Sequence, residues 1–255
     1  MKRIIFFLLL CVGLGNASQA QNFSIQSVQL GYRFYEISSV GNTPYTIINH
    51  LKDPQAYQEM IDQYETNGYT GGGGMLVPKQ YYINIELTGN QESKFWQKHS
   101  LQTGFFVGSQ LSQRMAIKNW RKVNNSLIIE EHYYFTKKQR FVGANLGLRR
   151  RVNLFKNAKF LIGLEAEGRM MVQHDYTQQL ESRGGSEGLT IEELPSFKGK
   201  LTTQGHLMLP FGFEYKYKSV SLRAEAFIGI ADDRYRSGIV SQEAHGLSFW
   251  LGYHF

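Results

Sequence analysis

Apolar residues occupy every second position in eight separate segments of this 255-residue chain. The last segment, LSFWLGYHF at 247–255, places only apolar and aromatic side chains on one face. Successive side chains of a β-strand point to opposite sides, so this spacing predicts strands with one apolar face. We expect eight strands, near 27–35, 81–88, 101–110, 141–149, 159–169, 206–215, 219–230 and 247–255. No apolar run of about 18 residues follows position 20, so no membrane-spanning helix is expected.

The connections between these segments alternate in length. Long ones, near 38–77, 112–140, 174–205 and 231–245, alternate with short ones, near 89–99, 152–159 and 216–219. Outer-membrane barrels have an even number of strands, short periplasmic turns and longer extracellular loops. The pattern therefore predicts an all-β fold, a transmembrane antiparallel up-and-down β-barrel of eight strands, with ten strands as the alternative.

The residues opposite the apolar faces indicate which way those faces point. In a soluble barrel or sandwich the apolar faces would point inward, and the opposite faces would meet water. The opposite faces are instead rich in glycine, carry Phe106, Phe227 and Trp250, and hold few lysines. Small and aromatic side chains suit a narrow, filled bore, so we expect the apolar faces to point outward to lipid.

The N-terminal segment has the features of an export signal. A basic start and an apolar run precede small residues at Ser18 and Ala20, the spacing that signal peptidase requires. We expect residues 1–20 to be cleaved, leaving 21–255 as a single barrel domain in the outer membrane of a Gram-negative bacterium. Cleavage would remove the only cysteine and two basic residues, which lowers the formal charge from +7 to +5. That excess fits anionic lipid headgroups, although an ordinary charged surface is the simpler interpretation.

Charged residues on the inward faces predict a network of ion pairs. Four arginines and five glutamates nearly cancel there: Arg33, Arg149, Arg169, Arg223, Glu86, Glu165, Glu167, Glu214 and Glu225. An eight-stranded bore is only wide enough for side chains to fill it, and buried charges need partners. Glu165 and Glu167 face the same way and need arginines between them. Paired carboxylates can also perform acid–base catalysis, but a filled bore gives a substrate no access, so we prefer the structural interpretation.

The first long connection contains a predicted amphipathic helix. Asp53 is a suitable N-cap and Pro54 a suitable first residue. One face of this helix carries Tyr57, Met60, Ile61 and Tyr64. The face either packs over the barrel mouth or binds a protein partner or lipid at the surface. The glycine run at 71–74 lacks the lysine of a phosphate loop, so no nucleotide site is expected.

The other long connections are expected to differ from the first. The stretch 112–140 predicts two strands that continue into a hairpin with residues 124–125 at its tip, whose basic and acidic arms pair with each other or bind lipopolysaccharide. The glycine-rich, acidic stretch at 181–200 is expected to be mobile. Pro210 lies inside a predicted strand and has no N–H for the ladder, so we expect a β-bulge there.

Four histidines fall near the predicted outer ends of strands: His132, His174, His206 and His245. A metal site or a histidine-based hydrolase at this rim is the chemistry they would support. No two of them have a tight ligand spacing. We therefore expect solvated rim histidines, no metal and no cofactor.

The export signal, the eight alternating strands, the asymmetric loops and the terminal Phe255 together resemble the small outer-membrane β-barrels of the OmpA-transmembrane-domain and OmpX type. The resemblance covers essentially the whole mature chain, and it is specific for architecture rather than for activity. In that family the barrel-assembly machinery recognises a last strand with a final aromatic residue. The resemblance assigns this role to Leu251, Tyr253 and Phe255. No periplasmic peptidoglycan-binding domain is expected after the barrel.

The preferred function is a non-enzymatic surface barrel that acts through its extracellular loops in surface interaction or envelope integrity. Its expected partners are outer-membrane lipid or lipopolysaccharide, the barrel-assembly machinery during insertion and a protein at the loops; nucleic acid is not expected. An accessory barrel of a secretion or assembly apparatus, similar to the PorT-like proteins, is the alternative. A lipid A-modifying enzyme is the third hypothesis. It lacks support. The deacylase type carries a His-x-Ser pair that this sequence does not contain, and the palmitoyl-transferase type has a helix before its first strand, whereas the first predicted strand here starts soon after the cleavage site.

Overall fold

The computed structural model describes residues 23–37, 51–55, 78–89, 93–122, 128–184, 188–235 and 238–255. Nine strands lie in these ranges: β1 (Ser24–Ile37), β2 (Lys79–Thr88), β3 (His99–Lys122), β4 (Ile128–Phe155), β5 (Ala158–Arg183), β6 (Leu189–Lys198), β7 (Thr203–Tyr217), β8 (Val220–Tyr235) and β9 (Gly238–His254). A helical turn begins at Pro54, where the sequence predicts a helix start. No helix in the described ranges is long and apolar enough to cross a membrane.

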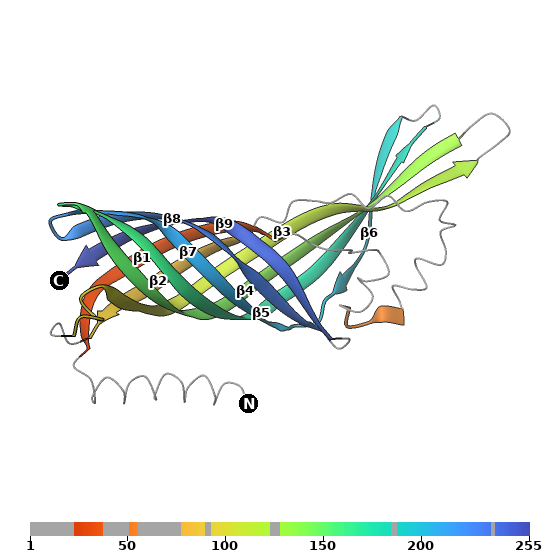
Figure 1. Ribbon diagram of the computed structural model, residues 1–255. Helices are drawn as coiled ribbons and strands as arrows, with labels where there is room; N and C mark the ends of the chain where they lie inside the picture. The colour runs from red at the N-terminus through yellow and green to blue at the C-terminus, as the bar shows by residue number, and fades with distance from the viewer. Residues whose placement is uncertain are drawn as a thin grey trace.

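Eight of these strands form a closed antiparallel ring (Figure 1). Neighbours around the ring are β1, β2, β3, β4, β5, β7, β8 and β9, and β9 pairs again with β1. The last pairing runs from Ser27↔His254 to Ile37↔Ala244. The eight ring strands contain the eight predicted segments in the same order. The predicted all-β antiparallel barrel of eight strands is therefore confirmed.

The two ends of the barrel differ. At one end, which we call the turn end, two-residue turns at 156–157 and 218–219 join neighbouring strands, and the C-terminus lies here (Figure 1). At the other end, which we call the sheet end, three strands continue well past the ring. The short connections at the turn end are as the sequence predicts. The expected long connection at 231–245 is wrong, because β8 and β9 run through it as paired strands with only 236–237 between them.

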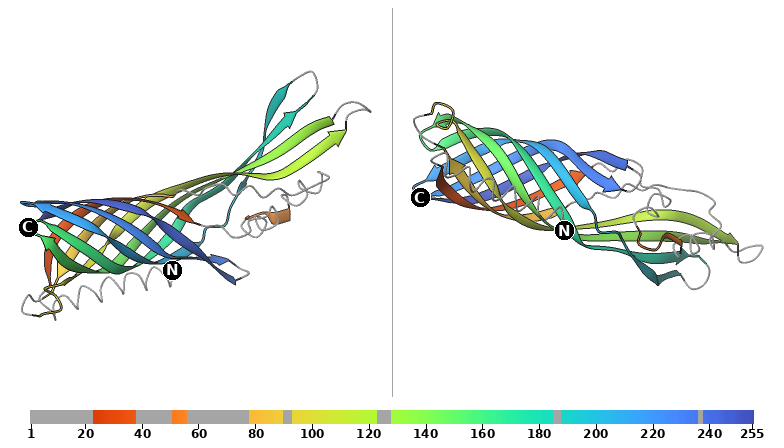
Figure 2. Two further views of the ribbon diagram at one scale, coloured as in Figure 1. Left: turned by 45° about the horizontal axis from the view of Figure 1, so that its top comes forward. Right: turned by 90° about the horizontal axis from the view of Figure 1, so that it is seen from below.

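The long strands form a second sheet beyond the barrel. β5 pairs with β7 up to Met170, and from Asp175 onward it pairs with β6 instead. β3 and β4 remain paired as far as Lys122↔Ile128. The outer parts of β3, β4 and β5, together with β6, make a four-stranded antiparallel sheet that extends away from the ring (Figures 1 and 2). We call it the projecting sheet.

The projecting sheet tests two expectations about the long connections. The predicted hairpin within 112–140 is confirmed, although its tip at 124–125 lies outside the described residues. The expectation of a mobile stretch at 181–200 is wrong for Leu189–Lys198, which is strand β6. Its backbone pairs with the outer half of β5, from Arg183↔Leu189 to Asp175↔Lys198.

Part of the first long connection lies against the base of the projecting sheet. Leu51 forms an isolated bridge with Gly199, and the backbone N–H of Lys52 donates to the carbonyl of Lys198 at 2.9 Å. Leu51 is almost fully buried. The connection between β1 and β2 therefore returns to the sheet end of the barrel.

The distribution of side chains is the inverse of that in a soluble protein. Among the described residues, 27 polar or charged side chains are buried against 14 apolar ones. The apolar faces of the ring strands are open to the surroundings, for example Ile83 at 63 %, Phe105 at 66 % and Phe213 at 60 %. The apolar faces therefore point outward, as the sequence predicts, and a soluble barrel with an apolar core is excluded.

Pro210 does not produce the expected bulge. The β7–β8 register continues through Pro210↔Phe227 without a shift. On the other side, Ile162 pairs with Phe211 and Glu165 with Met208, three residues further on both strands, so neither strand carries an extra residue. The missing N–H interrupts pairing with β5 locally, and the rest of the ladder holds the register.

Several predicted features lie outside the described residues. They are the cleaved segment 1–20, the helix face of Tyr57, Met60, Ile61 and Tyr64, and the glycine run at 71–74.

Closure between β1 and β9 predicts a specific cross-link. Leu30 and Leu251 are direct partners on outward faces, and opposed residues of antiparallel strands lie about 4.5–5.5 Å apart at Cα, which suits a disulfide. In a Cys11→Ser background, the Leu30→Cys/Leu251→Cys variant should form an internal disulfide on oxidation. The measurement is mobility on a non-reducing gel after boiling.

A matched control uses Leu30→Cys with Phe213→Cys. Both side chains face outward, but two strands separate β1 from β7 in the ring, so this pair should stay reduced. Closure would be contradicted by a free Leu30→Cys/Leu251→Cys pair or by equal cross-linking of the control.

Candidate functional site

Arg33 lies at the centre of the bore. It sits on the inward face of β1 and is almost completely buried. Its guanidinium forms ion pairs with Glu165, at 2.9 Å, and with Glu167. The rings of Tyr82 and Phe227 each lie 4.9 Å from the guanidinium carbon, a distance suited to cation–π attraction. Arg33 is thus the cation that separates the two neighbouring carboxylates of β5.

Arg149 extends this network toward β8. Its guanidinium forms ion pairs with Glu165 and, at 3.0 Å, with Glu225. Glu225 also accepts a hydrogen bond from the indole N–H of Trp250 at 2.9 Å and lies 3.9 Å from Arg223. Every carboxylate in this layer has a cationic or N–H partner, which buried charges require.

Arg151 is a lumen residue that the sequence reasoning missed. It forms ion pairs with Glu86 and, at 3.9 Å, with Glu214 near the turn end. The predicted strand stopped at 149, although Arg151 continues the inward alternation of Arg149. Extending the period by two residues would have found it.

Arg169 occupies the sheet-end side of the bore. It donates hydrogen bonds to Gln204 and to the hydroxyl of Tyr35. Its guanidinium carbon lies 4.6 Å from the Phe141 ring. The sequence places Arg169 beside Glu165 and Glu167, but Arg33 takes that position because it reaches across from β1.

Neutral amides complete the network and were also missed. Gln29 on β1 donates to Glu86 at 3.1 Å and accepts from Arg223 and from Gln102. Adding Arg151 gives five arginines and five glutamates in the described bore, so the formal charges cancel. The lumen is thus a polar network with balanced formal charges. The spacing of amide residues in the sequence does not identify which of them belong to this network.

Aromatic side chains occupy the space between the charged layers. One cluster consists of Tyr82, Phe106, Phe141 and Trp250. A second consists of Tyr35, Met208, Phe227, Ala231 and Ala244. Glycine makes room for these rings, since a Cβ on Gly31 would lie 2.4 Å from the Trp250 ring and a Cβ on Gly108 would lie 2.3 Å from the Phe141 ring. Aromatic and charged side chains together fill the bore.

The histidines do not form a common site. His132 bonds Glu130 at 2.6 Å, His174 bonds the carbonyl of Lys200 at 2.9 Å, His206 lies 3.8 Å from Glu167, and His245 is exposed. The expectation of solvated rim histidines is wrong for His174 and His206, which are buried. No group of three or more potential metal ligands occurs in the described ranges.

The projecting sheet carries a different chemistry from the bore. β6 lies at the end of the strand order, and nearly all its side chains are exposed, including Leu189 and Ile191. Lys198 pairs with Asp175 at 2.8 Å, and hydrogen bonds from Gln173 and Lys198 lower the pKa of the Asp175 carboxyl. β6 is thus an accessible edge strand, the kind of element to which another strand can add.

The predicted assembly residues lie on the outward face of β9. Leu251, Tyr253 and Phe255 are exposed by 50 %, 55 % and 80 %. Leu251 stands between Leu30 of β1 and Leu222 of β8. They are part of the apolar belt, and their role in assembly stays a prediction.

Removing Arg33 should destabilise the barrel strongly. The Arg33→Met variant leaves Glu165 and Glu167 buried without their shared cation, which costs about 3–5 kcal/mol of unfolding free energy. Arg33→Met/Glu167→Gln should recover part of that loss because one unpaired charge is removed. Urea titration in lipid vesicles, followed by tryptophan fluorescence, gives the values.

Arg140→Met is the control for loss of an arginine, since Arg140 is exposed on β4. Equal urea midpoints for the Arg33 and Arg140 variants would show that Arg33 does not hold the bore together.

Comparison with known proteins yields similarity to solved structures only. No family model matches the sequence, and no curated protein does. The neisserial surface protein A structure is similar at 12 % identity, with 91 % of this chain and 99 % of that chain covered and a TM-score of 0.37. Ail, the attachment invasion locus protein of Yersinia pestis, is similar at 8 % identity over 90 % and 97 % of the two chains, with a TM-score of 0.29. TM-scores below 0.5 are too low for these similarities to bear on function.

Proposed function

We propose that this chain is a non-enzymatic outer-membrane β-barrel that acts at the cell surface through its projecting sheet. The observation that carries the proposal is the four-stranded sheet that extends from one end of a closed and filled barrel, with β6 as an edge strand that, besides β5, only residues 51–52 contact among the described residues, near Lys198. The barrel supplies a fixed base, and the sheet supplies the accessible surface.

The membrane location is supported by the apolar belt. Exposed Leu, Ile, Val, Phe and Tyr side chains surround the ring, and charged side chains are buried inside it. Water would penalise such a surface, whereas the hydrocarbon core of a bilayer favours it. A ring of strands also leaves no unpaired backbone edge facing lipid. With the sheet end outward, lipopolysaccharide surrounds the base of the projecting sheet and the turn end meets the periplasm.

The projecting sheet suits a protein partner that contributes an extended strand. An edge strand offers backbone N–H and C=O groups, and a partner strand satisfies them. Leu189 and Ile191 provide apolar contacts on β6, while Glu192 and Glu193 add negative charge. A basic, extended segment of another protein is the partner that this edge fits.

The arrangement at the turn end does not support an enzyme. His254 Nε2 lies 2.8 Å from the Ser221 hydroxyl and 3.5 Å from Glu214. A serine hydrolase needs the two contacts on different ring nitrogens, so that the carboxylate orients the histidine that deprotonates the serine. Here the same nitrogen makes both contacts, which suits a structural bond.

Photo-crosslinking at β6 tests the surface role. A photoreactive amino acid at Ile191, which is 55 % exposed, should give a discrete protein adduct on irradiated cells. The matched site is Leu222, which is 61 % exposed but lies on the apolar belt and should give lipid adducts only. Adducts are detected by mass-shifted bands and mass spectrometry. A protein adduct at Leu222 but none at Ile191 would overturn the proposal.

The filled bore predicts the absence of a channel. Planar-bilayer recordings of the purified barrel should show no large, steady conductance, because charged and aromatic layers occupy the lumen. Phe106→Ala/Phe141→Ala/Trp250→Ala removes one aromatic layer and should produce measurable openings. Steady conductance of the unaltered protein would contradict a filled lumen.

A further inference from the structure

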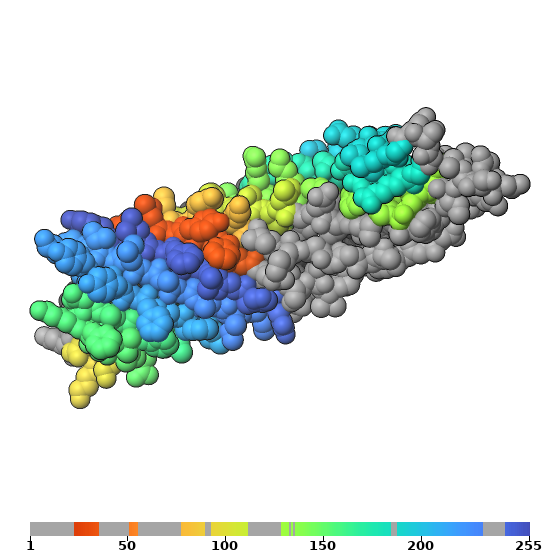
Figure 3. All heavy atoms as spheres, turned by 90° about the horizontal axis from the view of Figure 1, so that it is seen from above, coloured from red at the N-terminus to blue at the C-terminus, as the bar shows by residue number. Residues whose placement is uncertain are grey.

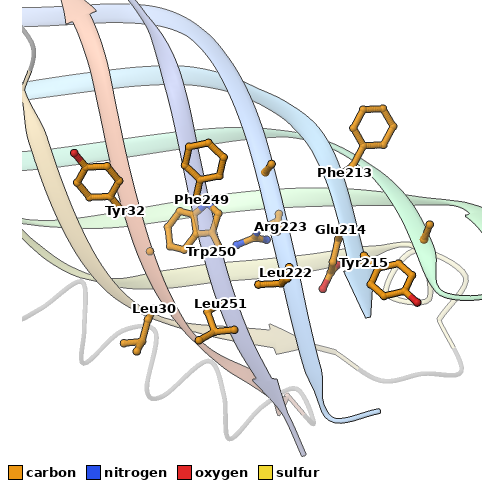
Figure 4. Close-up of a pocket in the computed structure, with 13 residues that line it drawn as sticks. Leu30, Tyr32, Phe213, Glu214, Tyr215, Leu222, Arg223, Phe249, Trp250 and Leu251 are labelled. Atoms are coloured by element: carbon orange, nitrogen blue, oxygen red, sulfur yellow. The ribbon is translucent and has the colours of Figure 1, made fainter. Parts of the chain in front are cut away.

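The outer wall of the barrel has a hollow over Ala224. The hollow has a volume of about 590 Å³ and is lined by residues of β1, β7, β8 and β9 and by Ala158 of β5 (Figure 4). Ala224 lies directly between Phe249 of β9 and Phe213 of β7, so a small side chain is flanked by two large ones. Leu222 and Leu251 border it on the side of the turn end. The depression follows from this contrast in side-chain size within the apolar belt.

Three lysines lie at the turn end below the hollow. Lys216 and Lys218 belong to the β7–β8 hairpin, and Lys156 lies in the turn between β4 and β5. The two turns are adjacent, since the backbone N–H of Lys216 donates to the carbonyl of Asn157 at 2.8 Å, and they meet at the left end of Figure 3. None of the three ammonium groups has a carboxylate of the described residues within 4.0 Å. The group is a cluster of uncompensated positive charge.

Aromatic side chains join this cluster to the apolar belt. The ammonium of Lys218 lies 5.5 Å from the ring of Tyr217, which is exposed on the outer wall. Tyrosine next to lysine at the edge of an apolar surface is the chemistry of a membrane interface. The lysines therefore lie at headgroup level when the belt lies in hydrocarbon.

The separation between the lysines and the hollow fits one lipid molecule. Ala224 follows Lys218 by six positions, of which the four from Val220 onward lie along β8, or about 13 Å of strand at roughly 3.3 Å per residue. A tilt of about 40° reduces this to roughly 10 Å along the bilayer normal. The hollow thus lies within the roughly 15 Å depth that one acyl chain spans, which is half the roughly 30 Å thickness of the hydrocarbon core.

We propose that the hollow and the lysine cluster form a binding site for an anionic glycerophospholipid in the leaflet at the turn end. The phosphate group lies among Lys156, Lys216 and Lys218, and an acyl chain lies against Ala224. The proposal rests on the membrane location proposed above. Charge argues against a second copy of this chain as the occupant, because a symmetric contact would bring two sets of unpaired lysines together.

The lipids that stay bound to the purified barrel measure its preference for an anionic over a zwitterionic headgroup. The barrel is reconstituted in nanodiscs with equimolar phosphatidylglycerol and phosphatidylcholine, then released in mild detergent for native mass spectrometry. The unaltered protein should retain phosphatidylglycerol preferentially, by roughly fivefold for each lysine that contacts the headgroup. Lys156→Gln/Lys216→Gln/Lys218→Gln should abolish the preference. Ala224→Phe should reduce the retention of both lipids because it fills the hollow.

Two matched variants control for general effects. Lys79→Gln/Lys138→Gln/Arg140→Gln removes three exposed cations at the sheet end, and Ala166→Phe enlarges an exposed outward alanine on β5 away from the hollow. Both should retain lipid as the unaltered protein does. Equal retention of the two lipids by the unaltered protein, or no change in either test variant, would overturn the site.

Heat-modifiable gel migration, recorded on every sample, separates this outcome from failure of the proposed membrane location. A chain that inserts and shifts on heating without lipid preference overturns the site alone. A chain that never inserts overturns both.

Discussion

The contact of Arg33 with Glu165 and Glu167 is the interaction on which the rest of the barrel depends. β1 and β5 lie opposite each other in a ring of eight, so this contact crosses the full width of the bore. A single arginine neutralises two carboxylates that would otherwise repel each other at adjacent inward positions. Removing one partner of such a buried group costs several kcal/mol, about as much as a marginally stable domain can lose. The same contact therefore spans the bore and balances its charges.

Burying the charges inside is what permits an outer wall made of apolar side chains. Tyr82, Phe227 and Trp250 face Arg33 and contribute buried area as well as cation–π attraction. Small residues such as Gly31 make room for the large rings. The outer belt is then built mainly of apolar side chains, the surface that the proposed membrane location requires.

Period-two alternation predicts the barrel because the two faces of each ring strand differ, with exposed apolar side chains on one face and a polar bore on the other. The same signal accounts for the inward positions of Arg33, Glu165 and Glu225. β6 escaped prediction for the opposite reason, since solvent lies on both faces of LTIEELPSFK and no alternation is selected. Pro210 was misjudged because a missing N–H does not require an extra residue when the flanking pairs hold the register. Contacts across the bore, such as Arg169 with Tyr35, depend on how far a side chain reaches toward a distant strand. The spacing of residues within one strand carries no information about such contacts.

The change of partner along β5 has a mechanical consequence. β4 and β5 stay paired from the turn at 156–157 out to Glu130↔Arg183, with register shifts at Asn153/Phe155 and at Arg140/Phe141, so the same two strands run through the barrel and the projecting sheet. A pull on the sheet runs along these strands and loads their hydrogen bonds in shear, all at the same time, instead of peeling them apart one by one. At the other end of the same strands, Glu165 and Glu167 are clamped by Arg33. A load applied to the projecting sheet is therefore carried directly into the wall of the barrel.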